Sequence, residues 1–183
     1  MHRRNGTSGF VDHGHHALFD RHIFLSLGGY DETLSHNEDA EYDLRLAKAG
    51  HKIWMAGEAA ITYFPRSSIS ALAMQYFRYG SGRAATYLKH NAPLKARQMF
   101  PVAAFLSCLA ATAAGLFISW SLIVPSAYFL SCVLAGFGLA IREKSLCVAV
   151  FGGVVSMTMH MAWAAGFLLQ IASERKRDFP SRK

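Results

Sequence analysis

The sequence predicts an α/β fragment followed by about three transmembrane helices. The chain has 183 residues, of which 52% are hydrophobic and 17% charged, and its mean hydropathy is +0.17. This composition is too apolar for a disordered chain. Charge is unevenly spread, because no Asp, Glu, Lys or Arg occurs in 101–141 or in 145–173. We therefore expect a polar domain at 1–98, a membrane region at 99–173 and a basic tail at 174–183.

Turn residues, apolar periodicity and capping residues predict the elements of the polar domain. In chain order these are a loop or strand edge at 6–15, a short helix at 19–27, a turn at Gly28-Gly29, a helix at 38–49 capped by Asn37 and ended by Gly50, strands at 52–56 and 59–64, and a helix from Ser67 or Ser68 to His90. Gly80 and Gly82 are expected to loosen the last helix.

The uncharged runs predict the membrane helices. A spanning helix needs about 20 apolar residues, so 101–141 is divided at a turn around Pro125 into spans at 101–120 and 122–141. A third span is expected at 147–170. A buried helical bundle is the alternative, but its helices would carry a polar stripe. Basic clusters flank all three spans, and three spans allow only two clusters on the cytoplasmic side, so the topology of the tail stays open.

The basic balance does not indicate a nucleic-acid-binding protein. The formal net charge is +7, but much of the excess lies beside the predicted spans, where anionic lipid headgroups are the nearer partner. We expect membrane lipids as partners and no nucleic acid.

Two neighbouring segments of the polar domain could shape a binding site. In Gly28-Gly29-Tyr30-Asp31-Glu32, adjacent glycines allow a sharp turn and close approach to a ligand, although an ordinary turn explains them too. In 37–45, five ionisable residues occur in a predicted helix whose inward face would hold Ala40, Leu44 and Ala47.

Asp39 is the candidate general base of this helix. It lies in the first turn, where free N–H groups and the helix dipole favour an ionised carboxylate. A carboxylate held there can accept the proton of an attacking hydroxyl. Asp43, four residues later, could orient Arg45 or a neighbouring helix. The alternative is a capped helix with an acidic start.

A third segment combines aromatic and cationic side chains on one helix face. Gln75, Arg78 and Tyr79 are spaced at i, i+3 and i+4, and Arg83 extends the same face. Arg78 offers a planar fork for phosphate oxygens, and Tyr79 offers a ring for a sugar. An amphipathic helix lying along the bilayer would show the same pattern.

The histidines of 13–16 are a fourth candidate. His13, His15 and His16 could bind a metal, but no cysteine or spaced carboxylate completes a ligand set. We therefore predict no metal site in the chain.

In order along the chain, these segments resemble the family 2 glycosyltransferases, inverting enzymes of the GT-A fold. Gly28-Gly29-Tyr30-Asp31-Glu32 is similar to the GG(F/Y)DE turn of that family, and Glu38-Asp39 to its ED motif. Gln75 to Tyr79 resembles the QxxRW motif of membrane-bound polysaccharide synthases, with Tyr in place of Trp. The sequence resembles in particular the bacterial exopolysaccharide glucosyltransferases of the succinoglycan type, over roughly its first 105 residues.

The resemblance implies a role for each matching residue. Asp39 would be the general base that deprotonates the acceptor hydroxyl, supported by Glu38. The turn would shape the acceptor site, and Tyr79 would contact the acceptor sugar. Because the family motif has Trp where this sequence has Tyr79, the role of Tyr79 corresponds least directly to that of the family residue. The remaining assignments are Gly28, Gly29, Tyr30 and Asp31 on the acceptor side, and Gln75, Arg78 and Arg83 at the donor diphosphate.

The implied reaction transfers a sugar, with inversion, from a nucleotide-sugar such as UDP-glucose to a polyprenyl-diphosphate-linked acceptor at the cell inner membrane. The catalytic part would face the cytoplasm. The family holds Mg²⁺ or Mn²⁺ with a DxD motif, which these 183 residues lack, as they lack the nucleotide-binding half. The chain would thus be the C-terminal portion of such an enzyme and inactive alone. The alternative is a non-catalytic membrane anchor derived from one.

Overall fold

The computed structural model describes residues 7–14, 17–59, 64, 66–92 and 94–178. The chain divides into two compact units, Met1–Pro65 and Arg66–Lys183. Residues 66–98, which the sequence groups with the polar domain, therefore belong to the same unit as the apolar helices. Each unit is described by itself.

A two-stranded sheet joins the ends of the first unit. β1 (Gly9–Val11) pairs antiparallel with β2 (Ile53–Met55), in a register that places Phe10 opposite Trp54. The two rings meet edge to face with centroids 5.0 Å apart. The sequence predicts both segments. The strand expected at 59–64 has residues 60–63 outside the described part of the chain, and a GT-A half-domain stays a prediction.

Two helices lie between these strands. α1 (Arg21–Ser26) is capped by Asp20, whose Oδ1 accepts from the amides of His22 at 2.8 Å and Ile23 at 3.1 Å. These hydrogen bonds lower the pKa of the Asp20 carboxyl. α2 (Glu38–Lys48) begins where the sequence predicts.

The predicted cap of α2 is wrong in its chemistry. Asn37 adopts a left-handed conformation, with φ of 63°, and its side chain makes no capping hydrogen bond. Asn tolerates this region because its short polar side chain can interact locally. The predicted end of the helix is confirmed, since Gly50 has a φ of 86°, a value that favours glycine.

An aromatic cluster forms the core of the first unit. Tyr42 is fully buried, and its ring contacts those of Phe19, Phe24 and Tyr30 at centroid distances of 4.9, 4.9 and 5.7 Å. The inward face of α2 is therefore not the predicted one of small and aliphatic residues. Its buried members are Glu41, Tyr42, Asp43 and Leu46, because Arg45 of the same helix compensates Glu41 and His13 contacts Asp43.

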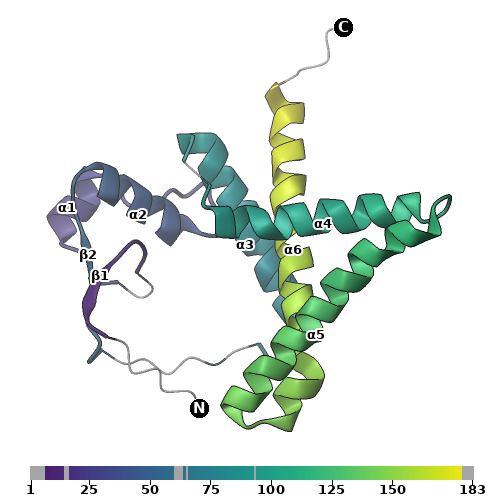
Figure 1. Ribbon diagram of the computed structural model, residues 1–183. Coiled ribbons are helices and arrows are strands. Elements are labelled where there is room, and N and C mark those ends of the chain that lie inside the picture. The colour runs from purple at the N-terminus through teal and green to yellow at the C-terminus, as the bar shows by residue number, and fades with distance from the viewer. Residues whose placement is uncertain (1–6, 15–16, 60–63, 65, 93, 179–183) are drawn as a thin grey trace, which may run out of the picture. The chain divides into compact units, whose positions relative to one another are not determined.

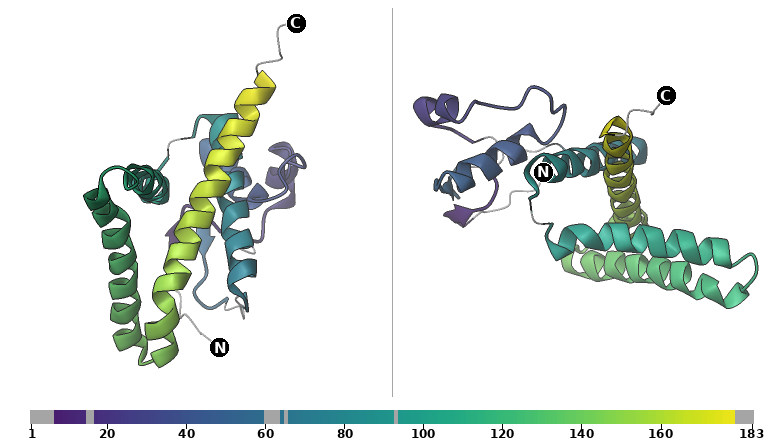
Figure 2. Two further views of the ribbon diagram at one scale, coloured as in Figure 1. Left: turned by 90° about the vertical axis from the view of Figure 1, so that its right-hand side faces the viewer. Right: turned by 90° about the horizontal axis from the view of Figure 1, so that it is seen from above.

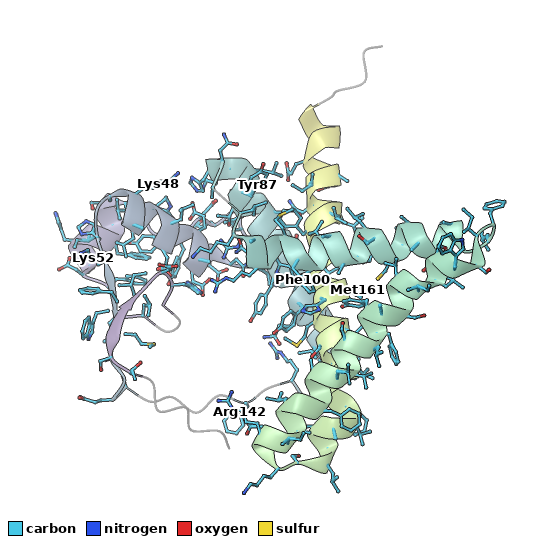
Figure 3. All side chains as sticks on the ribbon, viewed as in Figure 1. Lys48, Lys52, Tyr87, Phe100, Arg142 and Met161 are labelled. Atoms are coloured by element: carbon cyan, nitrogen blue, oxygen red, sulfur yellow. The ribbon has the colours of Figure 1, made fainter. Side chains whose placement is uncertain are left out.

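The second unit consists of helices. They are α3 (Ile69–His90), α4 (Ala96–Ala114), the short η1 (Ser119–Leu122), α5 (Ile123–Glu143) and α6 (Leu146–Asp178). α4 and α5 form a helical hairpin, and α6 returns along α5 and then along α3 (Figures 1 and 2). Phe100 of α4 meets the His160 ring of α6 at 5.4 Å near Met161 (Figure 3).

Two helices of the described chain are long and apolar enough to cross a membrane, by length and composition. They cover Ser119–Glu143 and Leu146–Glu174. The prediction of three spans is not confirmed, since α4 starts with the polar pair Arg97 and Gln98. The turn between α4 and α5 lies at 115–118 and not at Pro125. Pro125 is the third residue of α5, and a proline is tolerated in the first turn of a helix because the N–H that it lacks would have no partner there.

Glycines bring α3 and α6 into backbone contact. A Cβ placed on Gly80 would lie 2.0 Å from the carbonyl oxygen of Trp163, and one on Gly166 would lie 2.0 Å from that of Phe77. The prediction that Gly80 and Gly82 loosen α3 is wrong, because the helix is continuous and both glycines are buried. Small residues at this crossing allow the close approach seen between membrane helices.

Replacement of Gly80 by alanine should separate the two helices. The added methyl group would overlap the Trp163 carbonyl, and we expect a loss of roughly 1–3 kcal/mol of stability. Gly138→Ala is the matched control, since a Cβ there meets nothing within 4 Å and alanine favours helix. Thermal unfolding in detergent, followed by circular dichroism, measures the difference. Equal melting temperatures for the two variants would contradict the backbone contact.

Candidate functional site

One arginine fixes the glycine turn to α2. Arg45 donates to the carbonyl oxygens of Leu27 and Gly29, the latter at 2.6 Å. Gly28 and Gly29 have φ of 85° and 65°, a region that glycine enters without steric cost. The predicted turn is thus present, and its shape is tied to the helix that carries Asp39.

Glu41 holds Arg45 in place. Its carboxylate is fully buried and accepts from Nε of Arg45 at 2.9 and 3.0 Å and from Nη2 at 2.7 Å. Such a paired, charge-assisted contact is geometrically specific. The expectation that Asp43 orients Arg45 is therefore wrong. Glu41 does so at the i,i+4 spacing, which places both side chains on one face.

Two further carboxylates of α2, those of Asp39 and Asp43, meet at a histidine. Asp39 is half-buried, and its Oδ1 accepts from the amide of Ala40 at 2.7 Å. Its Oδ2 lies 3.8 Å from Nε2 of His13, whose Nδ1 lies 2.5 Å from Oδ2 of Asp43. Glu38, also half-buried, precedes Asp39 in the same turn. The structure thus brings the predicted pair to the start of α2.

Tyr30 and Asp31 follow the turn, and Tyr30 lies close to this acidic group. Burial raises the pKa of the Tyr30 hydroxyl, and the carboxylates of Asp39, Asp43 and Glu38 raise it further. Asp31 turns away to its own loop, where Oδ1 accepts from the amide and the hydroxyl of Thr33 at 3.0 and 2.7 Å. Tyr30 therefore lies within the electrostatic field of the candidate base, and Asp31 stabilises the loop that carries it.

The predicted donor residues lie on α3, in the second unit. Nε2 of Gln75 donates to Oη of Tyr79 at 2.8 Å, so these two side chains share a face as predicted. Arg78 is exposed and Arg83 half-buried. One turn further, Oγ of Ser81 donates to Oε1 of Gln170 on α6 at 2.9 Å. The structure therefore connects this segment to the longest helix of the chain.

The described residues do not fit a divalent cation. Among them, no group of three or more His, Cys, Asp or Glu side chains could hold a metal ion. His15 and His16 of the predicted histidine cluster lie outside the described residues.

Comparison with curated proteins identifies a relative of this chain. It is 40% identical over 177 residues to succinoglycan biosynthesis protein ExoA of Rhizobium meliloti (strain 1021). The resemblance to the succinoglycan-type family 2 glycosyltransferases is confirmed. The match covers 96% of this chain and 53% of ExoA, so the chain spans about half the length of this relative. No family model and no solved structure matches the chain.

Sequence reasoning assigned His13 to a metal-site candidate and overlooked Glu41. The signal for Glu41 was present, because Glu41 and Arg45 have the i,i+4 spacing of a helical ion pair. Nothing in the sequence indicated that His13 contacts Asp43, since the two residues are 30 positions apart.

Replacement of Arg45 by methionine should disorder the turn. The change leaves the Glu41 carboxylate buried without its counter-charge, at a cost of about 3 kcal/mol. Lys48→Met on the same helix is the control, because Lys48 is exposed near the end of α2 (Figure 3). Hydrogen exchange at the amides of Gly28 and Gly29 measures local opening. Exchange as slow as in Lys48→Met would contradict this role of Arg45.

Proposed function

We propose that the chain supplies the acceptor side and membrane part of an inverting glycosyltransferase of bacterial exopolysaccharide synthesis. The observation that carries the proposal is the candidate base, Asp39, beside a glycine turn fixed by Arg45, in a chain similar to a succinoglycan biosynthesis protein. The donor would be a nucleotide-sugar such as UDP-glucose, and the acceptor a saccharide linked to polyprenyl diphosphate.

Asp39 would act as the general base. Its carboxylate would accept the proton of the acceptor hydroxyl while the hydroxyl oxygen attacks the anomeric carbon and the diphosphate leaves. Each carboxylate oxygen has two lone pairs, so the Ala40 amide on Oδ1 leaves room for the hydroxyl. The Gly28–Gly29 turn and Tyr30 would shape the acceptor site, and Glu38 would add negative charge beside the base.

The side chains of α3 would act on the donor and on the sugar. Arg78, exposed and cationic, would stabilise the charge that develops on the leaving diphosphate, with Gln75 and Arg83 beside it. Tyr79 would contact the acceptor sugar with its ring. The hydrogen bond from Gln75 to Tyr79 would keep the two groups in one orientation.

The helices Ser119–Glu143 and Leu146–Glu174 would hold the enzyme in the cell inner membrane. Contact of α3 with α6 would keep the donor residues close to the lipid surface, where a lipid-linked acceptor is found. The polar unit would then face the cytoplasm, in which nucleotide-sugars are available.

The test uses a hybrid enzyme, in which the part of ExoA that this chain does not match is joined to the complete chain. Membranes containing the hybrid should transfer radiolabel from UDP-glucose to lipid-linked saccharide. Asp39→Asn should lower this transfer by roughly 10²–10⁴-fold, because an amide cannot accept the proton. UDP-glucose binding should change little.

Glu58→Gln is the matched control, since Glu58 is an exposed carboxylate of the same unit, and should keep full activity. Membranes with the 183-residue chain alone should transfer nothing. An inactive hybrid beside active ExoA, or an active Asp39→Asn hybrid, would contradict the proposal.

Arg78→Ala in the hybrid should affect the donor. Loss of a cation that stabilises the diphosphate should raise KM for UDP-glucose or lower kcat, together by about tenfold or more. Arg66→Ala, which removes an exposed arginine just before α3, is the comparison. If both variants have the same kinetic constants as the parent hybrid, Arg78 does not contribute to the donor site.

A further inference from the structure

His13 lies between two carboxylates of α2, one helical turn apart. Its Nδ1 is 2.5 Å from Oδ2 of Asp43, and its Nε2 is 3.8 Å from Oδ2 of Asp39. The two ring nitrogens therefore address different residues. One contact is a short hydrogen bond to a buried group, and the other faces the candidate base.

Asp43 is the anchor of this arrangement. It is only 2% exposed, and its Oδ2 also accepts from the amide of Gly14 at 3.0 Å. Its Oδ1 has no hydrogen-bond partner among the described residues. A buried carboxylate with one unpartnered oxygen is costly unless a positive group compensates it, and His13 is in position to do so.

The hydrogen positions follow from the acceptors. An ionised carboxylate only accepts, so Nδ1 of His13 carries a hydrogen toward Asp43. The charged groups that contact the ring are Asp39 and Asp43 of α2. Burial raises the pKa of Tyr30, and the carboxylates of Asp39, Asp43 and Glu38 raise it further, so Glu38 adds to the same negative field. This negative field favours an imidazolium, in which Nε2 also carries a hydrogen, toward Asp39.

We infer that His13 is a positioning residue for Asp39, held at Nδ1 by Asp43 and fixing the orientation of the Asp39 carboxylate through Nε2. The inference rests on the proposed function. The hydrogen bond to the Ala40 amide fixes Oδ1 of Asp39, and the imidazolium fixes Oδ2. These two contacts would fix the plane of the carboxylate that accepts the proton of the acceptor hydroxyl.

Two substitutions distinguish the roles of the two nitrogens of the His13 ring. The amide nitrogen of asparagine overlays Nδ1 of histidine, so His13→Asn keeps a donor to Asp43 and loses the group that faces Asp39. The longer His13→Gln places its amide near Nε2 and keeps a donor for Asp39. A histidine that only attaches its loop to α2 would therefore tolerate asparagine.

In the hybrid enzyme, His13→Asn should lower kcat by roughly tenfold, with KM for UDP-glucose unchanged, and His13→Gln should recover part of the loss. His51→Asn, at an exposed histidine after α2, is the control and should be fully active. Full activity of His13→Asn beside an inactive Asp39→Asn overturns the inference and leaves the proposed function standing. Full activity of Asp39→Asn overturns the proposed function and, with it, the inference.

A second measurement uses the complete 183-residue chain in detergent and needs no activity. Nuclear magnetic resonance of ¹⁵N-labelled histidine follows the titration of the His13 ring, identified by its loss in His13→Asn. Asp39→Asn should lower the titration midpoint by roughly half a pH unit or more, because it removes one negative charge beside Nε2. Glu58→Gln should leave it unchanged. An unchanged midpoint in Asp39→Asn would overturn the inference.

Discussion

The buried ion pair between Glu41 and Arg45 is the interaction on which the polar unit depends. Arg45 satisfies a carboxylate inside the unit and two carbonyl oxygens of the glycine turn. Because a guanidinium is planar and has five donors, one side chain can fix a helix and a turn together. The pair therefore sets the distance between the turn and the start of α2, where the candidate base lies.

Glycine has a corresponding role in the helical unit, through its size. At Gly80 and Gly166 the backbones of α3 and α6 touch, and Gly136 of α5 lies against Gly152 and Gly153 of α6 in the same way. In lipid, close backbone packing of this kind replaces the hydrophobic drive that water supplies elsewhere. α6 thus connects α3 to the helical hairpin, so α3 and its QxxR segment form one body with the candidate spans.

Prediction from sequence succeeded where the signal was local. The end of α2 follows from Gly50 and the start of α3 from Ser68, and the side-chain pair Gln75 and Tyr79 follows from helical spacing. It failed where the deciding contact is distant in sequence. The buried face of α2 is acidic and aromatic because His13 and Phe24 come to it from segments before the helix, and the glycines of α3 pack against a helix more than 80 residues away.

The sequence by itself determined the order of the motifs, the division into polar and apolar parts, and the resemblance to family 2 glycosyltransferases. These depend on residue type and spacing, which can be read along the chain. Only the tertiary structure decided that Asp43 pairs with His13, 30 positions away, and that His13 bridges the carboxylates of Asp39 and Asp43. The reason is physical: a charged side chain takes its role from the partner that neutralises it, and folding selects that partner.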